Sequence, residues 1–100
     1  MLIPLFYLLL LGSMATFLVS YDLRNSRNYN ELFKALKSYT HWGKILESTW
    51  AVVSNESASK IRDDLKTHID SDDGLFVVKS AGLSAWSNVN CSNEWLKENI

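Results

Sequence analysis

The first 21 residues of the chain contain no Asp, Glu, Lys or Arg, although the whole chain carries 10 basic and 11 acidic residues. Such an opening is typical of a segment that spans a membrane, is removed as a signal peptide or is buried in a core. Residues 14–21 are rich in strand-forming Thr, Phe, Val and Tyr. We therefore expect a buried strand there, which needs no membrane, and only residues 1–13 require another explanation.

Three interpretations of residues 1–13 stay open: an extension ahead of a natural start at Met14, a membrane anchor or secretory signal, or an extra folded element. A transmembrane helix needs about 20 apolar residues, so this segment alone is too short. Ser13-Met14-Ala15 matches a small-x-small cleavage site, but no basic residue precedes the apolar run. We expect an apolar extension over 1–13 and a single cytoplasmic domain over 14–100, with a membrane-anchored or secreted protein as the alternative.

Composition excludes several classes of protein. A formal net charge of −1 excludes a polycationic nucleic-acid coat and an acidic tail protein. A single cysteine, Cys91, excludes an intrachain disulfide. His41, His68 and Cys91 lack the spacing of a zinc site or of a nucleophile with its base, so we interpret them as structural.

The residues beyond Met14 alternate between strand and helix patterns. Apolar residues at helical spacing predict helices over 28–40 and 58–69, the second with Ser57 as its N-cap. Strands are predicted over 15–21, over 42–54 as two short strands joined at Glu47-Ser48, and over the apolar run 75–78, which we expect to be central and buried on both faces. A short helix over 94–100 is expected to follow a loop.

The predicted order is β-α-β-β-α-β, which indicates an α+β sandwich of ferredoxin-like topology. A four-stranded antiparallel sheet would carry two helices on one face. Its other face must be solvated or paired, and four Trp and four Tyr in so short a chain favour pairing with a second copy. We therefore expect a homodimer.

Several motifs resemble those of a known family. They are Tyr21-Asp22-Leu23-Arg24, Asn28-Tyr29, Leu36 to Tyr39, Trp42 to Trp50, Ile61-Arg62-Asp63, His68-Ile69-Asp70, Asp73 to Val77 and Ala85-Trp86. In this order, over residues 14–100, they resemble small bacterial and phage proteins labelled SinR-like. These are similar to the CRISPR-associated small endoribonuclease and spacer-integration subunit, and the VapD ribonucleases are similar in design.

The resemblance implies a ferredoxin-like homodimer in which the aspartate ending the first strand, here Asp22, meets its twin across the two-fold axis and binds a divalent metal. Two carboxylates with waters would suit Mg²⁺, which lowers the pKa of a bound water and stabilises charge on a phosphate. The alternative is that Asp22 caps the following loop. The family's serine-aromatic pair would correspond to Ser48-Thr49-Trp50, where one residue is inserted, so no role is assigned to Ser48.

Other polar residues near Asp22 have two interpretations each. Arg24 and Arg27 either hold the phosphates of a nucleic acid or are surface residues. Residues 22–50 carry a balance of +2 and residues 51–100 one of −3, so Asp22 lies in the basic half. The Asp70-Ser71-Asp72-Asp73-Gly74 segment resembles part of a calcium loop without its closing Glu, and we expect a solvated turn with Gly74 at positive φ.

Three functions follow as hypotheses. The first is a protein that binds RNA or DNA and cleaves phosphodiester bonds with Mg²⁺ at Asp22, with Arg24 and Arg27 as positioning groups. The second is a non-catalytic dimeric scaffold for DNA or a protein partner. The third is a small membrane-anchored domain, which depends on residues 1–13.

Overall fold

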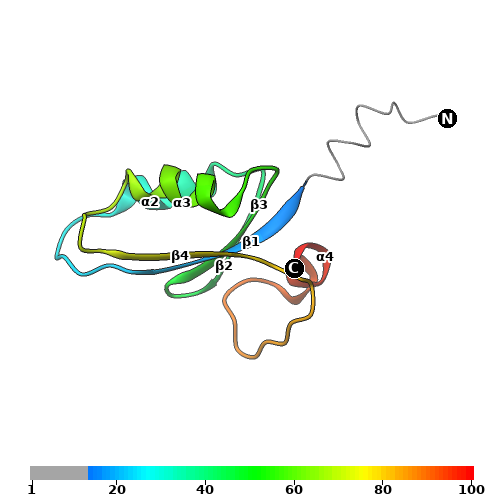
Figure 1. Cartoon of the computed structure of the whole chain (residues 1–100). Helices are drawn as coiled ribbons and strands as arrows, with labels where there is room; N and C mark the ends of the chain where they lie inside the picture. The colour runs from blue at the N-terminus through cyan, green and yellow to red at the C-terminus, as the bar shows by residue number, and fades with distance from the viewer. Residues whose placement is uncertain (1–13) are drawn as a thin grey trace.

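The computed structural model describes residues 14–100, so the predictions made for residues 1–13 lie outside the described residues. Its elements follow one another as β-α-β-β-α-β, with one more helix at the end (Figure 1). They are β1 (Ala15–Asp22), α2 (Asn30–Lys37), β2 (His41–Leu46), β3 (Thr49–Ser54), α3 (Ala58–Lys66), β4 (Gly74–Lys79) and α4 (Asn93–Asn99). In residues 14–100 no helix has both the length and the apolar character needed to cross a membrane.

The four strands form one antiparallel sheet in the order β2-β3-β1-β4. This order places the first strand between the third and the fourth, which is the arrangement of a ferredoxin-like fold. The predicted fold class is therefore confirmed. The interruption predicted at Glu47-Ser48 is the turn between β2 and β3, and the ladder also shifts register between Lys44 and Leu46, as a β-bulge does.

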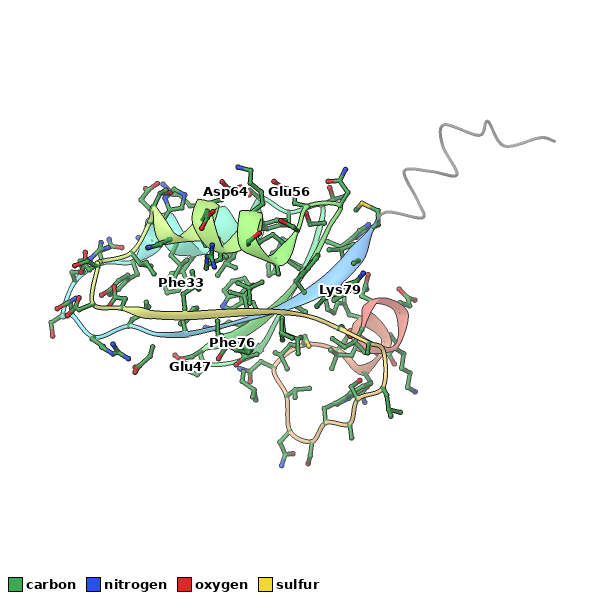
Figure 2. The ribbon with its side chains drawn as sticks, in the orientation of Figure 1. Phe33, Glu47, Glu56, Asp64, Phe76 and Lys79 are labelled. Atoms are coloured by element: carbon green, nitrogen blue, oxygen red, sulfur yellow. The ribbon has the colours of Figure 1, made fainter. Side chains whose placement is uncertain are left out.

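The core lies between the sheet and the layer formed by α2 and α3. Alternate residues of β1 and β3 point towards the helices, so that Val19 and Trp50 are paired and buried there. Each helix contributes an apolar stripe, with Leu32 and Leu36 from α2 fully buried. Figure 2 shows Phe33 between the two layers, where its ring stacks on that of Trp50 with 6.4 Å between centroids.

The predicted Ser57 cap is confirmed, because its side chain accepts a hydrogen bond of 3.1 Å from the backbone N–H of Lys60. The helix predicted from residue 28 begins at Asn30 instead. The side chain of Asn28 accepts the N–H of Asn30 at 2.7 Å, which holds the chain in a turn just before the helix.

The position predicted for the last strand is wrong. β4 lies at the edge of the sheet, and its residues alternate between the helix layer and the outside. Phe76 and Val78 face away from the helices and are 64% and 41% exposed. Figure 2 shows Phe76 on the side of the sheet opposite to α3. The continuous apolar run therefore reflects two apolar faces, of which one has no cover in the described part of the chain.

The face opposite α2 and α3 is not wholly open. The chain after β4 turns back, and α4 packs under one end of the sheet (Figure 1). The Thr16 hydroxyl donates to the carbonyl of Asn99, and the Ser80 hydroxyl donates to that of Ile100 at 2.6 Å. Leu96 of α4 is 2% exposed. The helix thus covers the start of β1, while the end of β1, at Asp22, stays uncovered.

Candidate functional site

Asp22 is the last residue of β1 and pairs with Gly74, the first residue of β4. Because side chains alternate along a strand, Asp22 points to the face opposite the helices, with Ser20 two residues before it. Its side chain is 73% exposed. The carboxylate predicted as the metal ligand therefore stands in solvent at the end of a central strand, where a cation or a second molecule can reach it.

Arg24 connects Asp22 to the turn that precedes β4. Its Nε lies 3.2 Å from Asp22 Oδ2, and its Nη1 donates to the carbonyl of Asp72 at 2.6 Å. Its backbone N–H donates to Asp73 Oδ1 at 2.7 Å. Arg24 thus fixes the direction of the chain after β1, and its guanidinium neutralises part of the charge beside Asp22.

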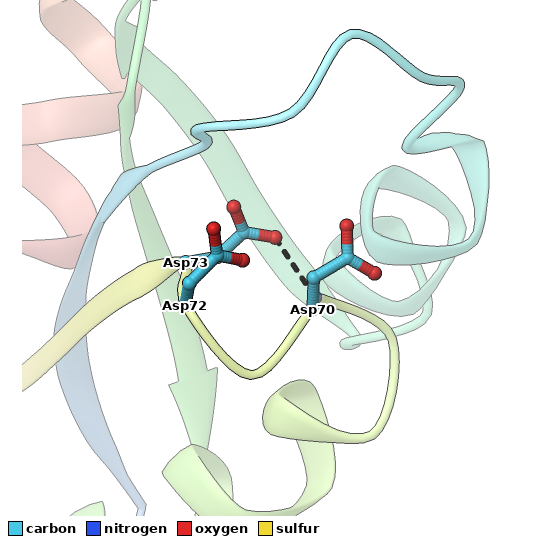
Figure 3. Close-up of side chains that lie close together, drawn as sticks. All are labelled: Asp70, Asp72 and Asp73. Atoms are coloured by element: carbon cyan, nitrogen blue, oxygen red, sulfur yellow. Dashed lines mark hydrogen bonds between the residues drawn. The ribbon is translucent and has the colours of Figure 1, made fainter.

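Three carboxylates gather in this turn, those of Asp70, Asp72 and Asp73 (Figure 3). One oxygen from each lies within 4.8 Å of the others, a spacing that oxygen ligands of a cation can adopt. The dashed line in Figure 3 joins Asp73 Oδ2 to the backbone N–H of Asp70, 2.8 Å away, which closes the turn.

The loop after β1 supplies partners for all three carboxylates. The amide of Asn25 donates to Asp70 at 2.9 Å and to Asp72 at 2.8 Å. Arg27 Nε donates to Asp70 at 2.9 Å, and the Tyr29 hydroxyl donates to Asp73 at 3.0 Å. We call this set of contacts between loop 23–29 and turn 70–73 the loop–turn clamp. Its carboxylates already accept hydrogen bonds from protein donors, so the clamp holds the loop and the turn together.

The electrostatics of Asp73 agree with that role. Partial burial alone would raise the pKa of its carboxyl, but hydrogen bonds from the backbone N–H groups of Arg24 and Asp70 and from Tyr29 more than offset this. The pKa of Asp73 is therefore lowered from its ordinary value, so the carboxylate stays charged at neutral pH.

Both arginines predicted to bind nucleic acid lie at this end of the fold. The Arg27 guanidinium makes contacts within the protein that Arg24 does not match. It donates to the carbonyl of Asn28 at 2.9 Å and lies 4.2 Å from the centre of the Tyr29 ring. For Arg24, the hydrogen bonds found within residues 14–100 use Nε and Nη1. Its Nη2 makes no hydrogen bond to another residue of this range.

The predicted positive φ at Gly74 is wrong, since Gly82 is the glycine of the described region that adopts it. Gly74 is needed for space: a Cβ there would lie 3.3 Å from both the Asp22 Cβ and Arg24 Nη2. The turn is also hydrogen-bonded to the loop, where we expected a solvated one. Ser48 lies in the turn between β2 and β3, and its carbonyl accepts the N–H of Tyr21 at 3.1 Å.

The loop–turn clamp itself was missed by sequence reasoning. Its two halves are polar loops whose contacting residues are 43 to 49 positions apart, and neither has a periodic pattern. The one available signal was charge, because a basic first half and an acidic second half are what such a clamp requires. That imbalance is now explained in part by Arg24 and Arg27 facing the acidic turn.

The comparison with protein families finds a match for this chain. The model of the family described as CRISPR associated protein Cas2 matches residues 14–86, most of the described chain. The match supports the CRISPR-associated part of the resemblance and gives no support to the SinR-like label. Cas2 proteins are CRISPR-associated endoribonucleases, which agrees with the nucleic-acid-associated interpretation of the sequence. The chain therefore belongs to the Cas2 family of CRISPR-associated proteins.

Proposed function

We propose that this chain is a homodimeric nuclease that cleaves phosphodiester bonds with Mg²⁺ bound between Asp22 and its twin. The observation that carries the proposal is the exposed Asp22 carboxylate at the end of a central strand, in a chain of the Cas2 family. One exposed carboxylate supplies too few oxygens for a tight Mg²⁺ site. Two copies related by a two-fold axis would bring two such carboxylates together.

The surface beside Asp22 supports the dimer. Phe76 and Val78 pair across the strand ladder with Ser20 and Leu18, so these residues lie on the same sheet face as Asp22. Phe76, at 64% exposed, is an unusually large apolar side chain to leave in water. A second copy packed on this face would cover it, and a two-fold interface places equivalent residues near each other.

The donor set suits Mg²⁺, which prefers carboxylate and water oxygens. When bound, the ion would lower the pKa of a coordinated water and neutralise charge on the scissile phosphate. Asp22 would hold the ion from each copy. We propose that Arg24, through Nη2, donates to a phosphate oxygen of RNA or DNA, and that Arg27 adds positive charge while it holds the loop in place.

The scaffold is the second candidate function. Each copy offers one exposed carboxylate at this point, and the three carboxylates of turn 70–73 have partners within the clamp. A dimer of this kind could bridge DNA or a protein partner without cleaving anything. In that case Asp22 would matter little for partner binding.

The test is a nuclease assay on the purified full chain, with RNA and DNA substrates, in Mg²⁺ and in EDTA. We expect cleavage in Mg²⁺ that is lost in EDTA and in Asp22→Asn. Asp63→Asn is the matched control, because Asp63 is also exposed and paired with an arginine, but lies on α3. Equal cleavage by Asp22→Asn and the unaltered chain would overturn the catalytic role of Asp22.

The dimer is tested separately by sedimentation. Phe76→Asp would put a charge in the proposed interface, so we expect it to shift the chain to monomers. A monomeric unaltered chain would refute the dimer. A dimer that binds nucleic acid and never cleaves it would support the scaffold.

A further inference from the structure

A pocket of about 290 Å³ lies in the helix layer, between the end of α2 and one side of α3. Its polar lining includes Tyr39, Glu56 and Asp64, and its apolar lining is Ala35 and Leu65. We call it the helix pocket. Figure 2 shows Glu56 and Asp64 in this layer, across the sheet from Phe76. The helix pocket is separate from the Asp22 site, since none of its lining residues belongs to β1, to loop 23–29 or to turn 70–73.

The helix pocket is negatively charged. Glu56 and Asp64 line it, while the described part of the chain contributes no Lys or Arg to its walls. Residues at the C-terminal ends of both helices line it as well, namely Ser38 after α2 and His68 after α3. The last carbonyl groups of a helix carry partial negative charge, which adds to that of the carboxylates. A ligand for this pocket therefore carries positive charge.

Two polar side chains of the helix pocket lack protein partners. Glu56 is partly buried, yet the ion pairs found within residues 14–100 do not include its carboxylate. The Tyr39 hydroxyl makes no hydrogen bond to another residue of that range. Burial first, and then the charges of Glu56 and Asp64, raise the pKa of Tyr39 to about 12. The hydroxyl therefore lies in the field of both carboxylates, and it keeps its proton at neutral pH while its lone pairs can accept a hydrogen bond.

Asp64 already binds one ammonium group of the protein. Lys60 Nζ lies 2.6 Å from Asp64 Oδ1, and Lys60 is not among the residues that line the helix pocket. Asp64 Oδ2 accepts no hydrogen bond from residues 14–100. An ammonium group has three N–H donors and no acceptor, so it matches a site whose polar atoms are carboxylate and hydroxyl oxygens. Hydrogen bonds between such charged groups are short and strong.

We infer that the helix pocket binds an aliphatic diamine or polyamine, with one ammonium held by Glu56 and the Tyr39 hydroxyl and a second held by Asp64. The methylene chain between them would lie against the apolar residues of the pocket, where its removal from water is favourable. A hydrated Mg²⁺ ion would gain nothing from Ala35 and Leu65, because it keeps most of its waters and prefers a compact octahedron of oxygens. The inference does not depend on the proposed function.

The experiment follows the backbone amides of the ¹⁵N-labelled full chain by NMR while spermidine is added at physiological salt and neutral pH. We expect saturable shifts at the amides of Tyr39 and His68. Glu56→Gln should weaken binding about 5- to 10-fold, because it removes a charge-assisted hydrogen bond at a partly exposed site. Tyr39→Phe should weaken it about 2- to 5-fold, as expected for one neutral acceptor. Glu31→Gln is the matched control, because Glu31 is an exposed acid of α2 paired with Lys34, and it should change nothing.

Three further titrations identify the ligand. Putrescine, with two ammonium groups, should bind more tightly than butylamine, which has one, and Glu56→Gln should remove that difference. A peptide with a single lysine should bind no better than butylamine; tighter binding than spermidine would mean that the ligand is a protein side chain and the polyamine assignment is wrong. Displacement of spermidine by an equal concentration of Mg²⁺ would mean a general cation site and would also overturn the inference.

The location of the shifts decides between the helix pocket and the acidic turn. Spermidine that moves only the amides of turn 70–73, or that binds Glu56→Gln as tightly as the unaltered chain, would refute the inference. The result is independent of cleavage: Asp22→Asn should bind spermidine as the unaltered chain does, and Glu56→Gln should leave any Mg²⁺-dependent cleavage unchanged. A chain that never cleaves but binds spermidine at Tyr39 and Glu56 would refute the proposed nuclease alone.

Discussion

The contact between Gly43 and Trp95 allows a quantitative test of how α4 is attached to the sheet. An alanine at position 43 would place its Cβ 2.9 Å from two carbons of the Trp95 ring, closer than unbonded carbons approach. Gly43 has an ordinary strand backbone, so alanine meets no conformational penalty there. The effect of Gly43→Ala should therefore be set by the collision alone.

Two opposing terms give the magnitude. Overpacking at a filled position costs about 1–3 kcal/mol, whereas replacing glycine at a compatible position stabilises a protein by about 0.4–1 kcal/mol through the unfolded state. We expect a net loss of about 1–2 kcal/mol in the free energy of unfolding. In a Trp95→Ala background the collision is absent, so the same change should be neutral or stabilising by up to about 1 kcal/mol.

The assay is urea unfolding followed by circular dichroism, which does not depend on the tryptophan removed. The four proteins of the cycle are the unaltered chain, each single variant and the double variant, and the coupling between positions should be about 1–3 kcal/mol. If Gly43→Ala costs the same with and without Trp95, the ring does not rest on the strand, and the proposed attachment of α4 to the sheet at this point is refuted.

Three smaller predictions concern a cap and two titrating groups. Ser57→Ala should lower the free energy of unfolding by about 1 kcal/mol, measured by urea titration, because the N–H of Lys60 loses its acceptor. Burial, with a smaller contribution from Glu56, raises the pKa of Tyr39 to about 12. The free energy of unfolding should therefore fall as the pH rises from 10 to 12, and it should fall less in Tyr39→Phe. Phenolate absorbance measures the titration. Because the pKa of Asp73 is lowered, the extra stability of the unaltered chain over Asp73→Asn should be present above pH 4 and vanish below it in acid unfolding curves.

The alternation of elements was predictable because each segment has a clear period. Helical spacing identified α2 and α3, and the polar break at Glu47-Ser48 separated β2 from β3. Helix ends were less predictable, since the start of α2 depends on one side-chain bond from Asn28. The edge position of β4 could not be predicted, because an apolar run has the same sequence whether a neighbouring strand, a helix or another molecule covers its second face.

The candidate site was predictable only in its local part. Asp22 ends a strand and is followed by Arg24 and Arg27, so a short stretch of sequence was enough to predict this part of the site. The loop–turn clamp depends on loops that the sheet brings together, and the contact between Trp95 and Gly43 depends on a chain reversal after β4. Neither leaves a local pattern, although a basic first half and an acidic second half are what the clamp requires.

The central place of β1 also affects how the chain acquires its structure. β1 is made before every other described element, yet it pairs with both β3 and β4. Its residue Val19, for example, lies opposite Trp50 of β3 and Val77 of β4. A newly made β1 must therefore wait, with its apolar residues exposed, until the most distant strand has left the ribosome. Contacts so far apart in sequence slow folding and lengthen the time in which aggregation competes. Among the described strands, the one that ends at Asp22 is the first to be synthesised and one of the last to gain all its partners.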